Sequence, residues 1–297
     1  MSTWLPDNTL AHLRDVAEWP ELSERYEVTE RLGRGGMGVV YAARDRVLDR
    51  DVAIKVLDAP NPDAQLAQRL REEAKILGRL EHPGIVPVHD AGTLPDGRAF
   101  YVMKLVRGDR LDRALGVEAS LGQRLERFLR ICDAVSFAHA QGIVHRDLKP
   151  ENVMIGSFGE VLVMDWGVAT LLESGDDNVV VGTPGFMAPE QSRGVADTRA
   201  DVFALGAILT AMLPTPIPRA LGAIAARAQA DSLHHRYATV SELAADVVRF
   251  RDGQKVDAYR ESPAERLARV YRRHRLPILL VVAYMAMRVV LLLWRGI

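Results

Sequence analysis

The stretch His145-Arg-Asp-Leu-Lys-Pro-Glu-Asn152, followed by Met164-Asp-Trp-Gly167, decides the fold of this chain. Together the two stretches place two aspartates, a lysine and a carboxamide within about twenty residues, on loops that join strand-like apolar runs. Such a set can position a hydroxyl nucleophile and hold metal ions against phosphate oxygens. One tripeptide of this kind would be read as a turn aspartate beside a solvated lysine. The full string favours a catalytic site.

The composition is that of an ordinary globular protein. The 297 residues allow one large domain or two modest ones, and 48% hydrophobic residues predict a sizeable core. The formal net charge of −1 gives no field that would recruit nucleic acid, so we expect no nucleic-acid partner. The single cysteine, Cys132, excludes an internal disulfide, and its place in a helical pattern predicts a buried core residue. The first twenty residues lack the pattern of a signal peptide.

The pattern of apolar residues changes along the chain from strands to helices. We expect strands at 26–32, 39–43, 51–57, 85–91 and 98–105, with a helix at 63–80. Further helices are expected at 124–141, 200–213, 219–230 and 240–251, the last of these capped by Thr239 with Glu242. Strands at the front and helices at the back predict an α+β, two-lobed fold. Residues 1–25 are read as an N-terminal leader and 254–275 as a basic linker.

Gly33, Gly35 and Gly38 stand at G-x-G-x-x-G spacing between the first two expected strands. Glycine permits a tight turn and lets backbone amides approach phosphates closely. By itself the motif fits a dinucleotide site or a plain hairpin turn equally well. A strand follows these glycines instead of a helix, which disfavours a Rossmann site or a P-loop.

Lys55 lies in an apolar strand, where it is either a snorkelling edge-strand lysine or a phosphate-binding charge. The helix at 63–80 helps to decide, because its inward stripe comprises Leu66, Leu70, Glu73 and Leu77. A carboxylate on that stripe is costly unless it is paired. We therefore predict an ion pair between Lys55 and Glu73, and a solvated Glu72.

Taken together, these residues resemble the bacterial eukaryotic-like (Hanks-type) serine/threonine protein kinases over approximately residues 26–253. The resemblance implies a protein kinase-like fold with a β-rich N-lobe and a helical C-lobe. It also implies transfer of the γ-phosphate of ATP, with Mg²⁺, to serine or threonine hydroxyls of a protein substrate.

The resemblance further implies roles for individual residues. Asp147 would be the catalytic base and Lys149 would neutralise the transferring phosphoryl group, while Asn152 and Asp165 would hold magnesium. The residues that would bind ATP are Leu32, Gly33, Gly35, Gly36, Gly38, Val40, Ala53, Lys55, Glu73, Met103, Lys104, Val106 and Met154. In this set Met103 resembles the gatekeeper, and residues 104–106 resemble the hinge that hydrogen-bonds adenine.

Contacts around the catalytic loop are implied as well. Glu190 would pair with Arg236, Thr183 would lie beside the catalytic aspartate, and Asp201 would brace the catalytic loop. Arg146, next to Asp147, suggests regulation by a phosphate in the activation segment. The candidate acceptors there are Thr170, Ser174 and Thr183, and self-association would allow autophosphorylation.

Three departures from the family pattern stand out. Trp166 replaces the usual phenylalanine of Asp-Phe-Gly, and Lys104 stands where a glutamate is common. Only Pro214-Thr-Pro-Ile-Pro218 joins two helices between which the family normally has a loop and an additional helix. That surface serves protein substrates and regulators, so its loss puts substrate docking in doubt but leaves the phosphotransfer residues untouched.

A 19-residue apolar run, Leu276 to Trp294, ends the chain, interrupted only by Arg288. At ~1.5 Å per residue it spans roughly 28 Å, close to the hydrocarbon thickness of a bilayer. Arginines precede it at 266, 269, 272, 273 and 275. We therefore predict a transmembrane helix at 276–294 that places a single-pass kinase in the cell membrane, its catalytic lobes cytoplasmic and no domain beyond the run. A helix buried on the main domain and a basic interfacial helix are the alternatives.

Two further functions stay open. One is a membrane-tethered pseudokinase or scaffold that binds nucleotide but transfers little phosphate, which the missing C-lobe segment favours. The other is a small-molecule kinase of related fold, which the activation-segment string Gly182 to Glu190 disfavours.

Overall fold

The computed structural model describes residues 19–35, 38–58, 64–114, 119–167, 170–171, 182–194, 197–273 and 275–295. Its N-terminal part is an antiparallel sheet in the order β1-β2-β3-β5-β4. The strands are β1 (Tyr26–Gly35), β2 (Gly38–Asp45), β3 (Arg50–Val56), β4 (Val88–Thr93) and β5 (Ala99–Lys104). All five overlap the strands expected from the sequence, although only the second half of 85–91 is strand. Ile85 instead makes an isolated bridge to Val163 in the C-lobe.

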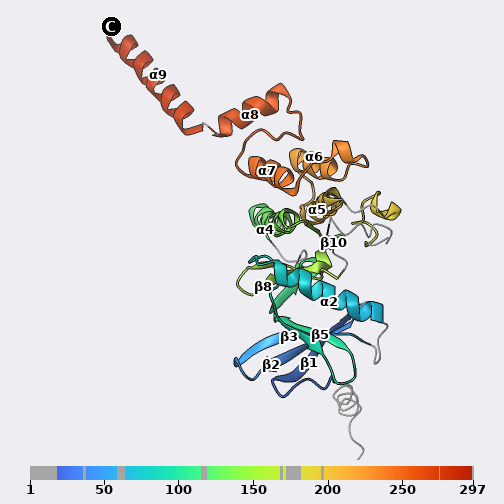
Figure 1. Ribbon diagram of the computed structural model, residues 1–297. Helices are drawn as coiled ribbons and strands as arrows, with labels where there is room; N and C mark the ends of the chain where they lie inside the picture. Colours follow the sequence, from blue (N-terminus) through green and yellow to red (C-terminus); the bar gives the residue numbers. More distant parts are fainter. Residues whose placement is uncertain are drawn as a thin grey trace, which may run out of the picture.

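Helix α2 (Ala64–Arg79) packs on this sheet and lies between it and the helical lobe (Figure 1). Its inward stripe is largely as predicted, because Leu70, Glu73 and Leu77 are buried. Leu66, at the start of the stripe, is 37% exposed. Glu72 is exposed and accepts a hydrogen bond from Gln68, as expected for a solvated residue.

The C-terminal part is built from stacked helices (Figure 1). The main ones are α4 (Leu121–Ala140), α5 (Thr198–Met212), α6 (Arg219–Ala228) and α7 (Val240–Arg251). Short elements join them: β6 (Gly108–Arg110), α3 (Leu111–Ala114), β7 (Ile143–Val144), η1 (Pro150–Asn152), β8 (Val153–Gly156), β9 (Val161–Val163), β10 (Thr170–Leu171), η2 (Gln191–Arg193) and η3 (Leu233–His235). The predicted two-lobed α+β fold is therefore present.

Side-chain caps explain where the long helices begin. Thr239 accepts a hydrogen bond from the backbone N–H of Glu242 at the start of α7, as predicted. Ser120 and Gln123 form a complete capping box that starts α4 at Leu121, three residues earlier than the sequence reading placed it. Such caps satisfy N–H groups that have no partner within the helix.

One hydrophobic cluster runs from the inner face of the N-lobe sheet through α2 into the C-lobe helices. Cys132 is fully buried in it, which confirms its predicted place, and burial raises the pKa of its thiol. Trp166 is also fully buried there. A second cluster covers the outer face of the sheet around Tyr41, Ile54 and Val102. A single continuous core therefore underlies the residues that are predicted to be catalytic.

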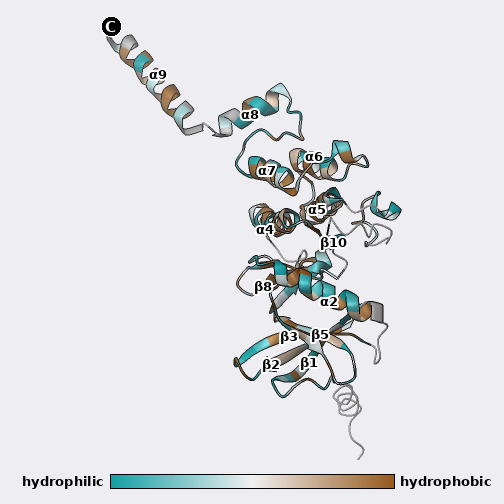
Figure 2. Ribbon diagram, in the orientation of Figure 1, coloured by the Kyte–Doolittle hydropathy of each residue, from teal (hydrophilic) through white to brown (hydrophobic). Residues whose placement is uncertain are grey.

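The C-terminal segment differs from the sequence reading in two ways. Part of the expected linker is helical, as α8 (Pro263–Arg273), and α9 (Arg275–Arg295) follows it away from the lobes (Figure 1). The prediction of a transmembrane segment at 276–294 is not supported: α9 covers that run, but among the described residues no helix is both long and apolar enough to cross a membrane. Arg288 interrupts the apolar run of α9 and contacts Tyr284. Figure 2 shows hydrophobic stretches along this helix, where Leu280 is 71% and Trp294 80% exposed.

Candidate functional site

The catalytic loop, which begins at His145 after β7, is held in place by the buried Asp201 of α5. The two carboxylate oxygens of Asp201 accept the backbone N–H groups of His145 and Arg146, each at 2.9 Å. His139 of α4 also contacts Asp201, at 2.8 Å. Burial would raise the pKa of the Asp201 carboxyl, but these contacts hold it below its ordinary value. The predicted brace is confirmed, and it sustains the left-handed backbone of Arg146, whose φ is 70°.

Asp147 stands at the centre of a compact polar group. Its Oδ1 accepts the hydroxyl of Thr183 at 2.7 Å, and its Oδ2 accepts Lys149 Nζ at 2.8 Å. Lys149 Nζ also donates to Thr183 Oγ1 at 2.7 Å. Asn152 Nδ2 donates to the backbone carbonyl of Asp147 at 2.8 Å, which orients the loop. A hydroxyl that contacts both the carboxylate and the ammonium group is thus held at the position that a general base requires.

A second polar group lies where the two lobes meet. Lys55 Nζ donates to both oxygens of Glu73, at 2.8 and 2.9 Å, which confirms the predicted pair. The same nitrogen donates to Asp165 Oδ1 at 3.1 Å. The Glu73 side chain is fully buried, whereas the side chain of Asp165 is 51% exposed. One lysine therefore joins the N-lobe helix to the metal-binding loop predicted in the C-lobe.

Charge and burial oppose each other in this group. Burial works against the charge on Lys55, but Glu73 and Asp165 outweigh it and raise the pKa of the ammonium group. Burial likewise opposes ionisation of Asp165, yet Lys55 holds the pKa of that carboxyl below its ordinary value. Burial raises the pKa of Glu73, with Lys55 and Tyr101 acting in the opposite direction. Lys55 and Asp165 are therefore both charged at neutral pH.

The chemistry of the donors fits a magnesium ion held partly by phosphate. Asp165 offers a half-exposed carboxylate, and it has a left-handed backbone with φ 57°. Because Asn152 turns its amide nitrogen towards Asp147, its carbonyl oxygen is the atom left for a metal. Magnesium usually takes one or two protein oxygens and completes its shell with water and substrate phosphates. Within the described ranges, no group of three or more histidine, cysteine, aspartate or glutamate side chains could hold a metal ion by itself.

The residues predicted to bind adenine come from four strands around the junction of the lobes, β2, β3, β5 and β8. Val40 pairs in register with Lys55, and Ala53 pairs with Met103 on β5. Met154 lies on β8, which pairs with the β6 strand that follows the hinge. Ala53 and Met103 are buried. Lys104, where a glutamate was expected, is an exposed residue at the end of β5.

The predicted glycines differ in what the structure demands of them. A Cβ on Gly38 would collide with the carbonyl oxygen of Val56, so this position admits only glycine. Gly33 has no atom within 4 Å of such a Cβ, and neither it nor Gly35 has a positive φ. Gly36 lies outside the described residues. Packing therefore explains Gly38 and leaves the space at Gly33 free for a ligand.

Trp166, the departure from the family motif, is fully buried against the catalytic loop. Its ring lies 4.6 Å from that of His145, measured between centroids. Its Nε1 points to the carbonyl of Val163 at 3.4 Å. The larger indole thus adds packing between the metal-binding loop and the catalytic loop while Asp165 keeps its contact with Lys55.

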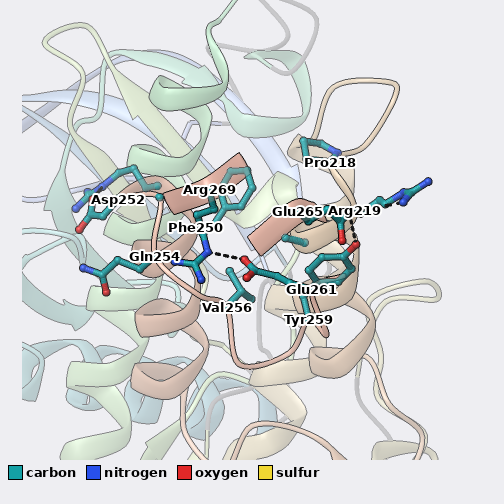
Figure 3. Close-up of a pocket in the computed structure, with 13 residues that line it drawn as sticks. Pro218, Arg219, Phe250, Asp252, Gln254, Val256, Tyr259, Glu261, Glu265 and Arg269 are labelled. Carbon is teal, nitrogen blue, oxygen red and sulfur yellow. Dashed lines mark hydrogen bonds and ion pairs between the residues drawn. The ribbon is translucent and has the colours of Figure 1, made fainter. Parts of the chain in front are cut away.

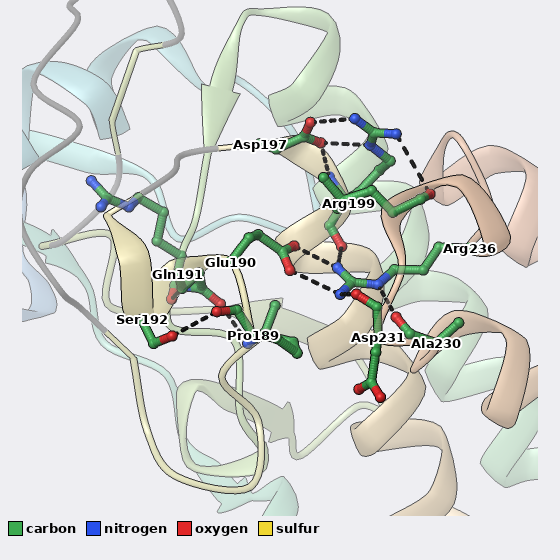
Figure 4. Close-up of polar contacts among 12 residues, drawn as sticks. Pro189, Glu190, Gln191, Ser192, Asp197, Arg199, Ala230, Asp231 and Arg236 are labelled. Atoms are coloured by element: carbon green, nitrogen blue, oxygen red, sulfur yellow. Dashed lines mark hydrogen bonds and ion pairs between the residues drawn. The ribbon is translucent and has the colours of Figure 1, made fainter.

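The end of the activation segment is anchored in the C-lobe (Figure 4). Arg236 donates to both carboxylate oxygens of Glu190, with 2.8 Å between Nη2 and Oε2. Gln191 Nε2 donates to the backbone carbonyl of Arg146 at 2.6 Å, which ties this anchor to the catalytic loop. The predicted Glu190–Arg236 pair is confirmed. Of the candidate phosphate acceptors, Ser174 lies outside the described residues and Thr183 is bound to Asp147.

A cavity lies elsewhere, between α6, α7 and α8 (Figure 3). It has a volume of about 670 Å³ and is lined by Pro218 and Arg219 at the short connection after α5 and by Glu261 and Arg269 near α8. Glu261 and Arg269 pair at 2.7 Å. None of the predicted site residues lines it. Helix α5 ends at Met212 and α6 begins at Arg219, so the predicted absence of an intervening helix is confirmed.

Sequence reasoning missed two residues near the site. Tyr101 donates its hydroxyl to Glu73, and His139 contacts Asp201. His139 lies at the last turn of the α4 helix and carried no motif of its own. Tyr101 could have been found only from the pairing of β3 with β5, because the two strands are separated by more than forty residues.

Comparison with known proteins places this geometry among kinases. The protein kinase domain family matches residues 26–249. The serine/threonine-protein kinase PknB of Mycolicibacterium smegmatis is 37% identical over 278 residues, covering 80% of this chain and 44% of that protein. The serine/threonine-protein kinase PknD of Chlamydia felis is 36% identical over 230 residues, covering 66% of this chain and 24% of that protein.

A solved structure agrees with these relatives. The crystal structure of the PknI kinase domain of Mycobacterium tuberculosis matches with a TM-score of 0.63 and 26% sequence identity. The match covers 78% of this chain and 98% of that one. By contrast, this chain spans less than half the length of the PknB and PknD relatives that it matches.

Proposed function

Because the chain belongs to the protein kinase family, within its bacterial serine/threonine branch, we propose that it transfers the γ-phosphoryl group of ATP to serine and threonine hydroxyls of proteins. The observation that carries the proposal is the presence of two complete polar groups at one site. Asp147 with Lys149 can orient and deprotonate a hydroxyl, while Lys55 with Asp165 can face phosphate and metal. Phosphoryl transfer needs mainly such positioning and charge neutralisation.

The division of labour follows from charge. Asn152 and Asp165 would hold magnesium, which neutralises the phosphate oxygens when it is bound. Lys55, fixed by Glu73, would contact the nucleotide phosphates. Asp147 would take the proton of the attacking hydroxyl, and Lys149 would balance charge on the group in transit. The three carboxylates and two lysines leave one excess negative charge, which favours binding of a cation.

Asp147→Asn is the direct test. The substitution should lower phosphate incorporation from labelled Mg-ATP by about 10²–10⁴-fold, the usual contribution of a general base, while the melting temperature changes little. Asp133→Asn is a matched control, because the side chain of Asp133 is 78% exposed on α4. Near wild-type turnover in the Asp147 variant would refute the assignment.

The acceptor and its regulation are part of the same proposal. Thr183 already donates its hydroxyl to Asp147, so we propose that it positions the base and that Thr170 or Ser174 takes the regulatory phosphate. We propose that a second copy of the chain transfers phosphate to these residues. Mass spectrometry of protein incubated with Mg-ATP at several protein concentrations tests both points. Phosphate on Thr183 alone, or a rate per molecule that does not rise with concentration, would contradict them.

A pseudokinase or scaffold is the second candidate. It is favoured by the direct connection of α5 to α6, which leaves no helix at a surface that kinases use for protein substrates. It predicts that the purified chain binds Mg-ATP but does not phosphorylate itself or a generic protein acceptor. A small-molecule kinase would phosphorylate neither and would show nucleotide turnover only with its small substrate. A labelled-ATP assay, with and without protein acceptor, separates the protein kinase from the other two. Nucleotide turnover in the presence of small hydroxyl compounds then separates a small-molecule kinase from a pseudokinase.

We also propose that the protein associates with a membrane through α9. The support is chemical: apolar side chains such as Leu280, Val281 and Trp294 are more than half exposed on this helix, which follows the basic α8. Truncation after Arg273 should leave a kinase of unchanged activity that no longer sediments with membranes. A carbonate wash distinguishes a peripheral contact from a deeper one. Full-length protein found only in the supernatant would refute membrane association.

A further inference from the structure

Tyr101 joins the buried Lys55–Glu73 pair at the junction of the lobes. Its side chain is buried in β5, and its hydroxyl donates to Glu73 Oε1 at 2.9 Å. Lys55 Nζ lies 5.8 Å from the centre of the same aromatic ring. Burial raises the pKa of the phenol well above its ordinary value, and the charge of Glu73 adds to this effect, so the hydroxyl keeps its proton as a donor.

The pairing of the strands places Tyr101 where it can act on the catalytic lysine. Lys55 on β3 and Tyr101 on β5 are direct partners across the antiparallel ladder. Side chains of such partners project from the same face of the sheet and stand close together. That face meets α2, and both side chains converge on Glu73. The sheet therefore holds one carboxylate of the helix with donors from two adjacent strands.

The two donors differ in what a nucleotide would do to them. Lys55 shares its hydrogens between Glu73 and Asp165, and in the proposed function it must also serve phosphate. The hydroxyl of Tyr101 has Glu73 as its carboxylate partner and is shut off from solvent. Its hold on Glu73 is therefore independent of what occupies the site.

We propose that Tyr101 is a positioning residue, whose hydroxyl fixes Glu73 and through it holds Lys55 in the orientation that ATP requires. The inference rests on the proposed kinase function and goes beyond it by assigning a role to a residue outside the kinase motifs. The phenol touches neither nucleotide nor substrate. Its effect on the reaction passes through the carboxylate, so removing the hydroxyl should matter only while Glu73 is present.

The test compares Tyr101→Phe with Tyr237→Phe. Tyr237 is an apt control, because its buried hydroxyl also donates to a buried carboxylate, Asp246, at 2.8 Å, but in the C-lobe and among no site residues. Each variant loses one hydroxyl and keeps its ring. We expect both to lower the melting temperature. Only Tyr101→Phe should lower kcat/KM for ATP, by about tenfold, the equivalent of one hydrogen bond to a charged group.

A double-mutant cycle shows whether the effect passes through Glu73. In a Glu73→Gln background, Tyr101→Phe should cause little further loss of kcat/KM. Equal kinetic losses in the two tyrosine variants, an unchanged kcat/KM in Tyr101→Phe, or strict additivity with Glu73→Gln would overturn the inference.

The same cycle can be run on Mg-ATP binding by calorimetry, which needs no turnover. If the wild-type chain binds nucleotide but transfers no phosphate, the proposed function fails and the binding cycle still decides the role of Tyr101. In that binding cycle, coupling between the effects of Tyr101→Phe and Glu73→Gln on the affinity for Mg-ATP supports the positioning role of Tyr101. Additive effects refute it. A wild-type chain that neither binds nor transfers would overturn both.

Discussion

Two buried ion pairs of similar chemistry serve different ends in this molecule. Lys55–Glu73 lies where the lobes meet, and Arg236–Glu190 lies within the C-lobe (Figure 4). Each joins a cation to a glutamate that is almost completely shielded from solvent. What separates them is the environment of the cation rather than the pair itself.

Arg236 has a protein acceptor for every hydrogen that it can donate. Besides both oxygens of Glu190, it donates to the backbone carbonyls of Ala230, Arg199 and Asp231. The guanidinium group has five N–H donors, and these five contacts use all of them. The guanidinium group of Arg236 has no N–H left with which to bind a ligand. We therefore infer that the Arg236–Glu190 pair serves to anchor the activation segment.

Lys55 also has three hydrogens and three acceptor oxygens, but one belongs to a half-exposed carboxylate. Asp165 can exchange that contact for a metal ion, since half of its side chain is accessible to solvent. The group formed by Lys55, Glu73 and Asp165 also carries one excess negative charge, whereas the Arg236–Glu190 pair is neutral. A buried pair indicates a functional site when a third, accessible charge shares its cation.

The largest effect should come from breaking the structural pair. Arg236→Met leaves Glu190 buried without a partner, so the free energy of unfolding should fall by about 3–5 kcal/mol while the folded fraction keeps its activity. Urea denaturation and kinase assays on the same preparation measure the two quantities. Replacing Glu190 with leucine as well should recover part of the stability, because the unpaired charge is gone. A large loss of activity per folded molecule would break the comparison.

The functional pair should give the opposite pattern. Lys55→Met should lower phosphate transfer by about 10²–10³-fold, because a preorganised charge at the phosphates is lost. It should also destabilise the fold, but less than Arg236→Met, because Glu73 retains Tyr101 as a donor. Lys75→Met, at an exposed position of the same helix α2, is the control and should change neither quantity. Should the Lys55 variant keep both its rate and its stability, neither the charge of Lys55 nor its pair with Glu73 contributes to catalysis or to the fold.

The contribution of a purely structural carboxylate can be measured from the pH dependence of the free energy of unfolding, and Asp246 is suited to this test. Burial disfavours ionisation of Asp246 in α7, but hydrogen bonds from the backbone of Asp257 and from Tyr237 hold the pKa of its carboxyl below the ordinary value. A depressed folded-state pKa gives stability that is fully present above the unfolded-state value, about 3.9, and is lost as pH falls through the folded-state pKa.

The stability difference between wild type and Asp246→Asn should therefore stay constant from pH 7 to about pH 5 and shrink below about pH 4. Urea unfolding at a series of pH values measures it. A difference that persists undiminished to pH 3 would show that ionisation of Asp246 does not stabilise the fold.

The smallest effect concerns a cap remote from both pairs. Thr239→Ala removes the hydroxyl that accepts the N–H of Glu242 at the start of α7 and should cost about 1 kcal/mol of stability without changing activity. Ser241→Ala, at an exposed position in the first turn of α7, is the control and should be near neutral. Thermal unfolding of both variants decides whether the N-cap contributes.

Local patterns predicted much of this architecture. The Lys55–Glu73 pair followed from one helical stripe, and the start of α7 followed from the Thr239–Glu242 cap. Helix α8 was missed although its signal was present. Ser262 and Glu265 form a capping box, and Pro263, which was read as a linker residue, is favourable at the first position of a helix.

The rest depended on contacts between distant segments. The role of Tyr101 requires the register of β3 against β5, and no local period encodes that register. The apolar run at the C-terminus showed the limit of composition as a guide, because its length and hydropathy suggested a membrane span that the described helix α9 does not support. The missed contacts of Tyr101 and His139 depend on tertiary partners outside any motif, whereas α8 was missed despite its local signal.

The close contact at Gly38 indicates what kind of selection would act on each glycine of the G-x-G-x-x-G motif. Selection for a folded chain acts on Gly38 directly, because any side chain there would strike the adjacent strand β3 at Val56. At Gly33 that constraint is absent, so glycine there would be preserved by selection for a ligand or for the register shift of β1 between Arg31 and Gly33. One short sequence signature can therefore record two separate evolutionary pressures. A lineage that abandons catalysis would lose Gly33 more readily than Gly38.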